Sequence, residues 1–189
     1  MIFVLVGESA SGKSTIEEMI VSNSRNFQRV ISYTTRPMRK GERQNVNYHF
    51  VSKEIFDEMV LNDAFIEKAK YRGWDYGSNK SDYLCDKNIV VVLTPHGCRS
   101  LKRWAANQGK KVVSIYFNID RRSRLIKILN RGDDIEEAYR RNLSDVGQFD
   151  GFSDEADYVI YNECYSKSVE DVYSEVKQII DKELENENI

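Results

Sequence analysis

Short apolar segments alternate along the chain with longer segments in which apolar residues recur at helical spacing. The apolar segments are rich in β-branched residues and predict strands at 2–6, 29–33, 88–93, 111–117 and 157–161. Helices are expected after residue 15, at 53–62, from about residue 97, around residues 125–129, in the charged segment near residues 140–141, and after residue 168. Strands that alternate with helices predict an α/β fold with a parallel central sheet, right-handed crossovers and ligands at the carboxyl ends of the strands.

One segment departs from this alternation. Residues 34–80 carry a basic turn, an aromatic stretch and one helix, and are dense in Tyr, Gly and charged residues. We interpret 34–80 as an inserted substrate-binding subdomain and assign the core to residues 1–33 and 81–189. At the other end, Ser168 and Asp171 have the spacing of a capping box that opens the last helix, and the acidic tail 183–189 is expected to fray.

The first predicted strand leads directly into a phosphate-binding motif. Residues Gly7 to Ser14 read G-x-x-x-x-G-K-S, which is the P-loop pattern between a strand and a helix. Gly7 and Gly12 permit the sharp turns that direct backbone N–H groups at a polyphosphate. Lys13 is expected to reach the β- and γ-phosphates, and Ser14 to ligate Mg²⁺. The predicted ATP-binding residues of this segment are Gly7, Ser9, Ser11, Gly12, Lys13, Ser14 and Thr15.

Composition, charge and the lengths of the apolar segments argue against several classes of protein. The 189 residues are enough for one domain with a small insertion, and a net charge of −2 argues against a nucleic-acid-binding surface. No apolar segment reaches membrane-spanning length, and no signal peptide is visible, so we expect a cytoplasmic protein that does not bind membranes. Cys85, Cys98 and Cys164 lack metal-ligand spacing and are expected to be reduced thiols.

The insertion contains a second set of candidate binding residues. Arg36 and Arg39 bracket Pro37, and two guanidinium groups so placed can hold one dianion, although a solvated basic loop would have the same pattern. Farther along, Glu67 taken singly is more typical of a surface carboxylate, and Tyr76 taken singly is more typical of a packed ring, than of a binding site.

The order and spacing of these residues resemble the guanylate kinase family. The resemblance extends nearly from end to end and is carried by GESASGKST, ISYTTRPMRKGE, NYHFVSKEIFDEM, FIEKAKYRGWDYGS, NRGDDIEEAYRR and DYVIYNE. It implies a P-loop NTPase-type three-layer fold with a GMP-binding insertion and a mobile lid at about 131–148. It also implies an ATP:GMP phosphotransferase whose GMP-binding residues are Ser32, Arg36, Arg39, Tyr48, Glu67, Tyr76, Ser78 and Thr94. By the same resemblance, Asn162 lies beside the adenine of ATP.

The chemistry of Glu67 supports this assignment independently. Guanine presents N1–H and the N2 amino group side by side, and one carboxylate accepts both hydrogen bonds. Adenine has a bare N1 lone pair and no amino group there, so it leaves the carboxylate unpaired. Sites built on such buried hydrogen bonds discriminate by about 10⁴ or more. Ser78, as a donor, complements guanine O6.

Phosphoryl transfer requires in-line placement, neutralised charge and exclusion of water. We assign Lys13 to the phosphates of ATP, and Arg131 with Arg140 or Arg141 to the transferred group, with Arg141 preferred. Mg²⁺ is expected as the cofactor with ATP as phosphoryl donor. A solvated helix face explains Arg140 equally well.

Two departures from the family pattern affect this reading. Where the family ends its middle strand with D-x-D-x-x-G, this chain has Val92 and Thr94 and therefore no carboxylate. A lid position that is Arg in the family is Asn142. His96 is too isolated to carry weight as a replacement. A slower enzyme or a changed acceptor would follow from these substitutions.

Three functions remain in competition at the level of sequence. The first is a guanylate kinase that phosphorylates GMP or dGMP, acts as a monomer or homodimer and has no nucleic-acid partner. The second is a P-loop kinase of the same fold with a different acceptor. The third is a non-catalytic guanylate-kinase-like binding module, against which the intact P-loop argues.

Overall fold

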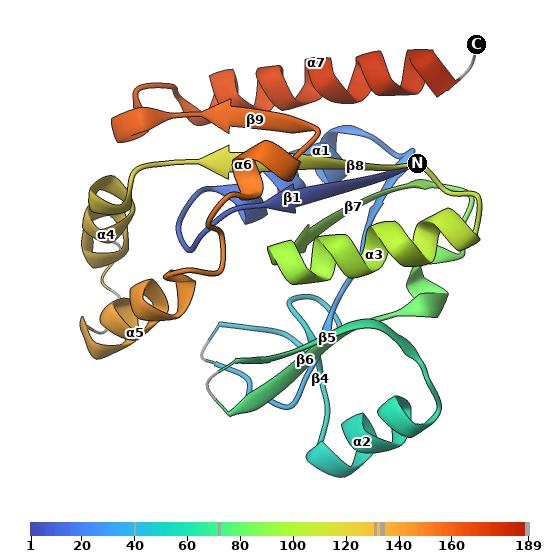
Figure 1. The fold of residues 1–189 in the computed structure, drawn as a ribbon. Coiled ribbons are helices and arrows are strands. Elements are labelled where there is room, and N and C mark those ends of the chain that lie inside the picture. Colours follow the sequence, from blue (N-terminus) through green and yellow to red (C-terminus); the bar gives the residue numbers. More distant parts are fainter. Residues whose placement is uncertain (40, 72, 131, 133–134, 188–189) are drawn as a thin grey trace.

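The structure, a computed structural model, describes residues 1–39, 41–71, 73–130, 132 and 135–187 (Figure 1). Its central sheet is parallel and has the strand order β2-β7-β1-β8-β9. The strands of this sheet are β1 (Ile2–Val6), β2 (Phe27–Arg29), β7 (Asn88–Leu93), β8 (Val112–Asn118) and β9 (Tyr158–Tyr161). None of the described helices is long and apolar enough to cross a membrane.

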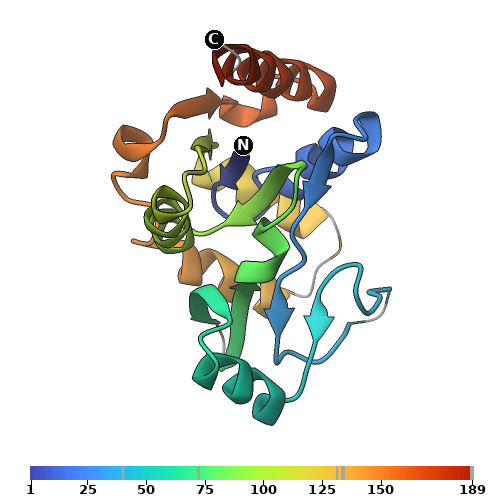
Figure 2. The same cartoon turned by 90° about the vertical axis from the view of Figure 1, so that its right-hand side faces the viewer.

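Helices cover both faces of the central sheet. Alternate residues of β1 point to opposite faces, so that Ile2 and Val4 belong to one core and Phe3 and Leu5 to the other. The first core is covered by α3 (Pro95–Asn107) and α6 (Phe152–Glu155), and the second by α1 (Lys13–Asn23) and α7 (Val169–Glu187). The result is the three-layer arrangement predicted from the sequence, with both faces of the parallel sheet buried (Figures 1 and 2).

A second, smaller sheet lies beside this core. It has the strand order β4-β3-β6-β5, and β6 pairs antiparallel with both of its neighbours. It is formed by β3 (Tyr33–Thr34), β4 (His49–Phe50), β5 (Phe65–Tyr71) and β6 (Trp74–Asn79), with α2 (Lys53–Leu61) packed against it. The rings of Phe56 in α2 and Phe65 in β5 stack with centroids 4.6 Å apart.

The predicted strand 29–33 is wrong as a single element. Its first residue ends β2, which pairs with β7 in the central sheet, and its last residue begins β3, which pairs with β6 in the second sheet. The β-branched run was read as one strand because composition does not show that the chain changes sheets at residues 30–32.

Two helix boundaries also differ from the prediction. α3 begins at Pro95 rather than near residue 97, because Thr94 caps it and proline is suited to the first helical turn. α7 continues to Glu187, although the tail from residue 183 was expected to fray. Glu183 explains the difference, since it pairs with Lys111 at 2.8 Å and accepts a hydrogen bond from Tyr158 at 2.6 Å.

The remaining helices lie at the carboxyl edge of the central sheet. α4 (Arg121–Asn130) follows β8, and α5 (Ile135–Asp145) packs against α4 within the segment 131–148 that we predicted as a lid. Two short 3₁₀ turns, η1 (Lys80–Tyr83) and η2 (Glu163–Tyr165), connect the sheet strands to neighbouring elements. In Figure 1 the strands β1, β8 and β9 point toward the side occupied by α4 and α5.

Candidate functional site

The P-loop joins the end of β1 to the start of α1. Gly7 has φ 155° and Gly12 has φ 96°, both in the region that favours glycine. A Cβ at Gly7 would lie 2.8 Å from the Oγ of Ser11 and 3.0 Å from the carbonyl oxygen of Phe117, so no other residue fits there without displacement. The motif therefore folds into a tight loop that encloses the Lys13 side chain.

Lys13 lies across this loop. Its Nζ donates to the carbonyl oxygen of Glu8 at 2.8 Å and to the Oγ of Ser11 at 3.0 Å. Burial lowers the pKa of Lys13 to about 8, and the nearby carboxylates of Asp145 and Glu8 oppose that shift. Anionic phosphate groups at this position would favour the charged ammonium.

The start of α1 lies between two cavities. Ser14 lines the first cavity together with Ser32, which lies between the two sheets, and Tyr48, which precedes β4. Thr15 lines the second cavity together with Asn162, on the opposite side of the helix. The P-loop thus contributes consecutive residues to two separate ligand-sized spaces.

The loop after β9 contributes Asn162, Tyr165 and Lys167 to the lining of the second cavity. The buried side chain of Asn162 accepts from the backbone N–H of Lys167 at 2.8 Å and donates to its carbonyl oxygen at 3.2 Å. Tyr165 donates its hydroxyl to the carbonyl oxygen of Ala10 at 2.8 Å, and the Lys127 ammonium lies 4.1 Å from the centre of its ring. These contacts hold the loop after β9 against the P-loop.

The first cavity adjoins the arginine cluster predicted from the sequence. Arg36 is buried and forms a two-pronged contact with Glu42, with N–O distances of 2.7 and 3.0 Å. Its guanidinium carbon lies 5.4 Å from the centre of the Tyr48 ring, and Tyr76 packs edge-on against Tyr48 at 5.9 Å. Arg39 is exposed, and its backbone N–H donates to Glu42 at 2.7 Å. The structure therefore brings these four predicted residues together around Glu42.

Glu67 and Ser78 form a buried pair on adjacent strands β5 and β6. The Ser78 hydroxyl donates to Oε1 of Glu67 at 2.7 Å. Burial raises the pKa of Glu67, while the hydrogen bonds from Ser78 oppose that shift. A Cβ at Gly97 would lie 3.5 Å from Oε2 of Glu67, which places the start of α3 beside this carboxylate. Thr94 caps α3 by accepting the backbone N–H of Gly97 at 3.2 Å.

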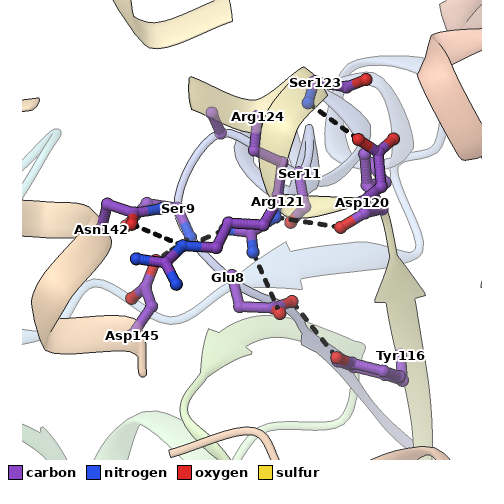
Figure 3. Close-up of polar contacts among 12 residues, drawn as sticks. Glu8, Ser9, Ser11, Tyr116, Asp120, Arg121, Ser123, Arg124, Asn142 and Asp145 are labelled. Carbon is purple, nitrogen blue, oxygen red and sulfur yellow. Dashed lines mark hydrogen bonds and ion pairs between the residues drawn. The ribbon is translucent and has the colours of Figure 1, made fainter. Parts of the chain in front are cut away.

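An ionic network connects the P-loop to α4 and α5 (Figure 3). Arg124 lies 3.3 Å from Glu8 and 3.7 Å from Asp145. The Tyr116 hydroxyl donates to the other oxygen of Glu8 at 3.2 Å. Asp145 in turn accepts the backbone N–H of Ser9 at 2.8 Å. The predicted lid segment is thus bonded directly to the phosphate-binding loop.

The predicted lid arginines are only partly described. Arg131 and the side chain of Arg141 lie outside the described residues, and Arg140 is exposed. Asn142, at a position where the family has Arg, is buried and accepts a hydrogen bond from Nε of Arg121 at 2.7 Å. Figure 3 places Arg121 and Asn142 beside the P-loop residues Glu8 and Ser9.

Comparison with known proteins identifies the family. A family model described as guanylate kinase matches residues 1–183. The chain belongs to the guanylate kinase family. A guanylate kinase of Polaromonas sp. is 30% identical over 175 residues, which cover 90% of this chain and 84% of that protein. A guanylate kinase of Prochlorococcus marinus subsp. pastoris is 29% identical over 181 residues, with 93% and 96% covered.

A solved structure shows the same fold. The guanylate kinase from Anaplasma phagocytophilum superposes with a TM-score of 0.67 at 23% identity, covering 97% of this chain and 85% of that one. The predicted family, P-loop fold and ATP:GMP phosphotransferase activity are therefore confirmed. The individual site residues stay predictions.

Sequence reasoning missed several residues of the site. It did not identify Glu8, Arg124 and Asp145 as a network, because they are far apart in the sequence and form no motif. Tyr165 follows Asn162 by only three residues, but it was missed because its contact with Ala10 of the P-loop joins segments far apart in the sequence. Glu17 lines the first cavity beside Ser14, and its place one turn after Ser14 in a predicted helix was the only available signal.

Proposed function

We propose that the two cavities hold the two nucleotides of the guanylate kinase reaction, with GMP or dGMP in the first and the base end of ATP in the second. The observation that carries this proposal is the placement of Ser14 and Thr15, which line opposite cavities from one helical turn. A phosphoryl group held at the P-loop would lie between donor and acceptor, as direct transfer requires.

On the donor side, the P-loop binds the phosphates. The backbone N–H groups of residues 7–15 and the start of α1 supply the anion site, with Ser9, Ser11 and Thr15 completing it. Lys13 is the catalytic residue that neutralises the β- and γ-phosphates, and its buried position strengthens that interaction. Asn162 presents a fixed amide in the second cavity, where adenine is assigned.

On the acceptor side, Arg36, Arg39, Tyr48 and Tyr76 bind the phosphate of GMP. Glu42 fixes the Arg36 guanidinium, so its remaining N–H donors are already oriented. We assign Ser32, Glu67, Ser78 and Thr94 to the guanine; Ser32 lines the first cavity, and the Glu67–Ser78 pair lies beside the start of α3. Glu67 accepts N1–H and the N2 amino group, which its burial makes selective against adenine.

The donor set near Ser14 fits Mg²⁺. The Ser14 hydroxyl is exposed at the start of α1, and the Glu17 carboxyl group faces the same cavity. No group of three or more His, Cys, Asp or Glu residues in the described part of the chain could hold a metal ion unaided. This agrees with an ion held mainly by nucleotide phosphates and water. When bound, Mg²⁺ neutralises charge on the β- and γ-phosphates.

Closure of the segment 131–148 would bring Arg131 and Arg141 to the transferred phosphoryl group. Arginines supplied in this way contribute roughly 10³–10⁵ in rate. We further propose that the protein acts on free nucleotides in the cytoplasm, as a monomer or homodimer and without a nucleic-acid partner. Its net charge of −2 supports the last point.

Substitution of Lys13 tests the P-loop mechanism. Lys13→Ala removes the positive charge of the P-loop, so ADP formation from ATP and GMP should fall at least about 10³-fold. GMP affinity, measured by calorimetry, should change less than about threefold, because GMP is assigned to the other cavity. Lys177→Ala, which alters an exposed lysine of α7, is the matched control and should retain full activity. Full turnover by Lys13→Ala would rule out this mechanism.

A further inference from the structure

Glu17 lies on the same face of α1 as Ser14, one turn farther along the helix. Both residues line the first cavity together with Val92 near the end of β7, whose backbone contacts the Glu17 carboxyl group. β7 is the direct neighbour of the strand that enters the P-loop, with Leu93 in register with Val6. Glu17 therefore occupies the space between the P-loop serine and the carboxyl end of the neighbouring strand.

That strand end supplies no carboxylate. In P-loop NTPases generally, an acidic residue at the end of a hydrophobic strand helps the P-loop Ser or Thr to hold Mg²⁺. Here the corresponding strand ends in Val92 and Leu93, and the hydroxyl of Thr94 is engaged as the cap of α3. Of the acidic residues that line this cavity, Glu17 is the nearest to Ser14 in the sequence.

Glu17 is placed so that a cation bound beside it in the complex with nucleotide would stabilise its charged carboxylate. Burial raises its pKa to about 7, while the Arg29 charge and the backbone of Val92 act in the opposite direction. A carboxylate held in such a position is destabilising when charged, and a nearby divalent cation removes that penalty. Carboxylate oxygens are also the preferred protein partners of Mg²⁺, which keeps several water ligands.

We propose that Glu17 is the positioning residue for the nucleotide-bound Mg²⁺, accepting hydrogen bonds from its water ligands in place of a strand-end aspartate. The inference rests on the proposed use of MgATP at this P-loop. The carboxylate reaches the ion from the helix that follows the P-loop rather than from the strand beside it. Ser14 remains the direct protein ligand.

The alternative role for Glu17 is charge balance for Arg29, which lines the same cavity and donates to the carbonyl oxygen of Val46 at 2.7 Å. The two roles differ in what they predict for metal binding. If Glu17 only balances the charge of Arg29, its substitution would change nucleotide binding equally with and without metal. A positioning residue for Mg²⁺ would affect nucleotide binding only when the metal is present.

The test measures metal affinity directly. Mn²⁺ replaces Mg²⁺, and its binding to the complex of the protein with ADP is followed by electron paramagnetic resonance. Glu17→Gln should weaken Mn²⁺ binding about 10- to 100-fold, the usual effect of losing a partner of a metal's ligands. ADP affinity without metal should be unchanged. Glu18→Gln, which alters the exposed neighbouring residue, is the matched control and should behave as wild type.

A second variant returns the carboxylate to the strand. The double variant with Glu17→Gln and Val92→Asp should recover at least about a third of the Mn²⁺ affinity that Glu17→Gln alone loses. The unfolding midpoint of the double variant checks that the protein is folded. Unchanged Mn²⁺ affinity in Glu17→Gln would overturn the proposal, as would an equal loss of ADP affinity without metal. Since GMP is absent from this experiment, failure of the proposed GMP phosphorylation would appear separately, as lack of turnover by the wild-type protein.

Discussion

At the scale of single residues, burial and pairing suit Glu67 to the guanine-selective role that we propose for it. In the sequence it is one acidic residue among 30. In the structure it is buried, bonded to Ser78 and adjacent to the start of α3. A buried acceptor pair that must be satisfied by its ligand discriminates strongly, because a ligand without the matching donors leaves it unpaired.

Glu67→Gln should therefore lower kcat/KM for GMP by about 10²–10³-fold, because the amide NH₂ group replaces one of the two acceptors of the guanine donor pair. The KM for ATP should stay within about twofold of the wild-type value. Steady-state kinetics with each nucleotide varied in turn measures both effects. Glu58→Gln alters an exposed residue of α2 and serves as the control. Unchanged kinetics with GMP would remove Glu67 from the guanine site.

At the scale of elements, the local pattern of apolar and polar residues predicted most strands and helices. It failed for segments whose structure depends on contacts with residues far away in the sequence. The P-loop, its strand and its helix follow from glycine positions and apolar periodicity within 20 residues. Residues 30–32 were misread because they connect two sheets whose strands pair with partners far away in the sequence. The extent of α7 was underestimated because Lys111, just before β8, and Tyr158, at the start of β9, anchor Glu183 from distant parts of the sequence.

The contact between the P-loop and helices α4 and α5 was likewise invisible in the sequence. Arg124 is spaced like any other charged residue of a surface helix, and its burial follows only from the turn that places α4 over the loop. Glu8 and Asp145, which face it, come from segments more than 130 residues apart. Networks of this kind depend on tertiary placement, and no local signal encodes them.

Arg124→Met should lower the free energy of unfolding by about 2–4 kcal/mol, because it leaves two partly buried carboxylates without their cation. Urea denaturation followed by circular dichroism measures this difference. Arg122→Met, at an exposed position of the same helix, should change the free energy of unfolding by less than about 0.5 kcal/mol. If Arg124→Met lowers the free energy of unfolding by no more than the control variant does, the network contributes no stability.

At the scale of the whole molecule, two sheets and the start of α1 position the residues that we assign to the two nucleotides. The central sheet presents the P-loop at its carboxyl edge, and the second sheet carries the arginine cluster and the Glu67–Ser78 pair. α1 begins between the cavities assigned to the two nucleotides. Val92 and Thr94 supply no carboxylate, and Glu17 of α1 offers one in the first cavity beside Val92.

The most direct test of the account is ADP formation from MgATP with a panel of acceptors, namely GMP, dGMP, IMP, AMP, CMP and UMP. The account predicts turnover with GMP and dGMP, and a kcat/KM for AMP at least about 10⁴-fold lower, because guanine offers two donors to the Glu67 carboxylate and adenine offers none there. Preferential turnover of another monophosphate would contradict the assigned guanine site. Binding of GMP without any ADP formation would contradict the assigned phosphoryl transfer.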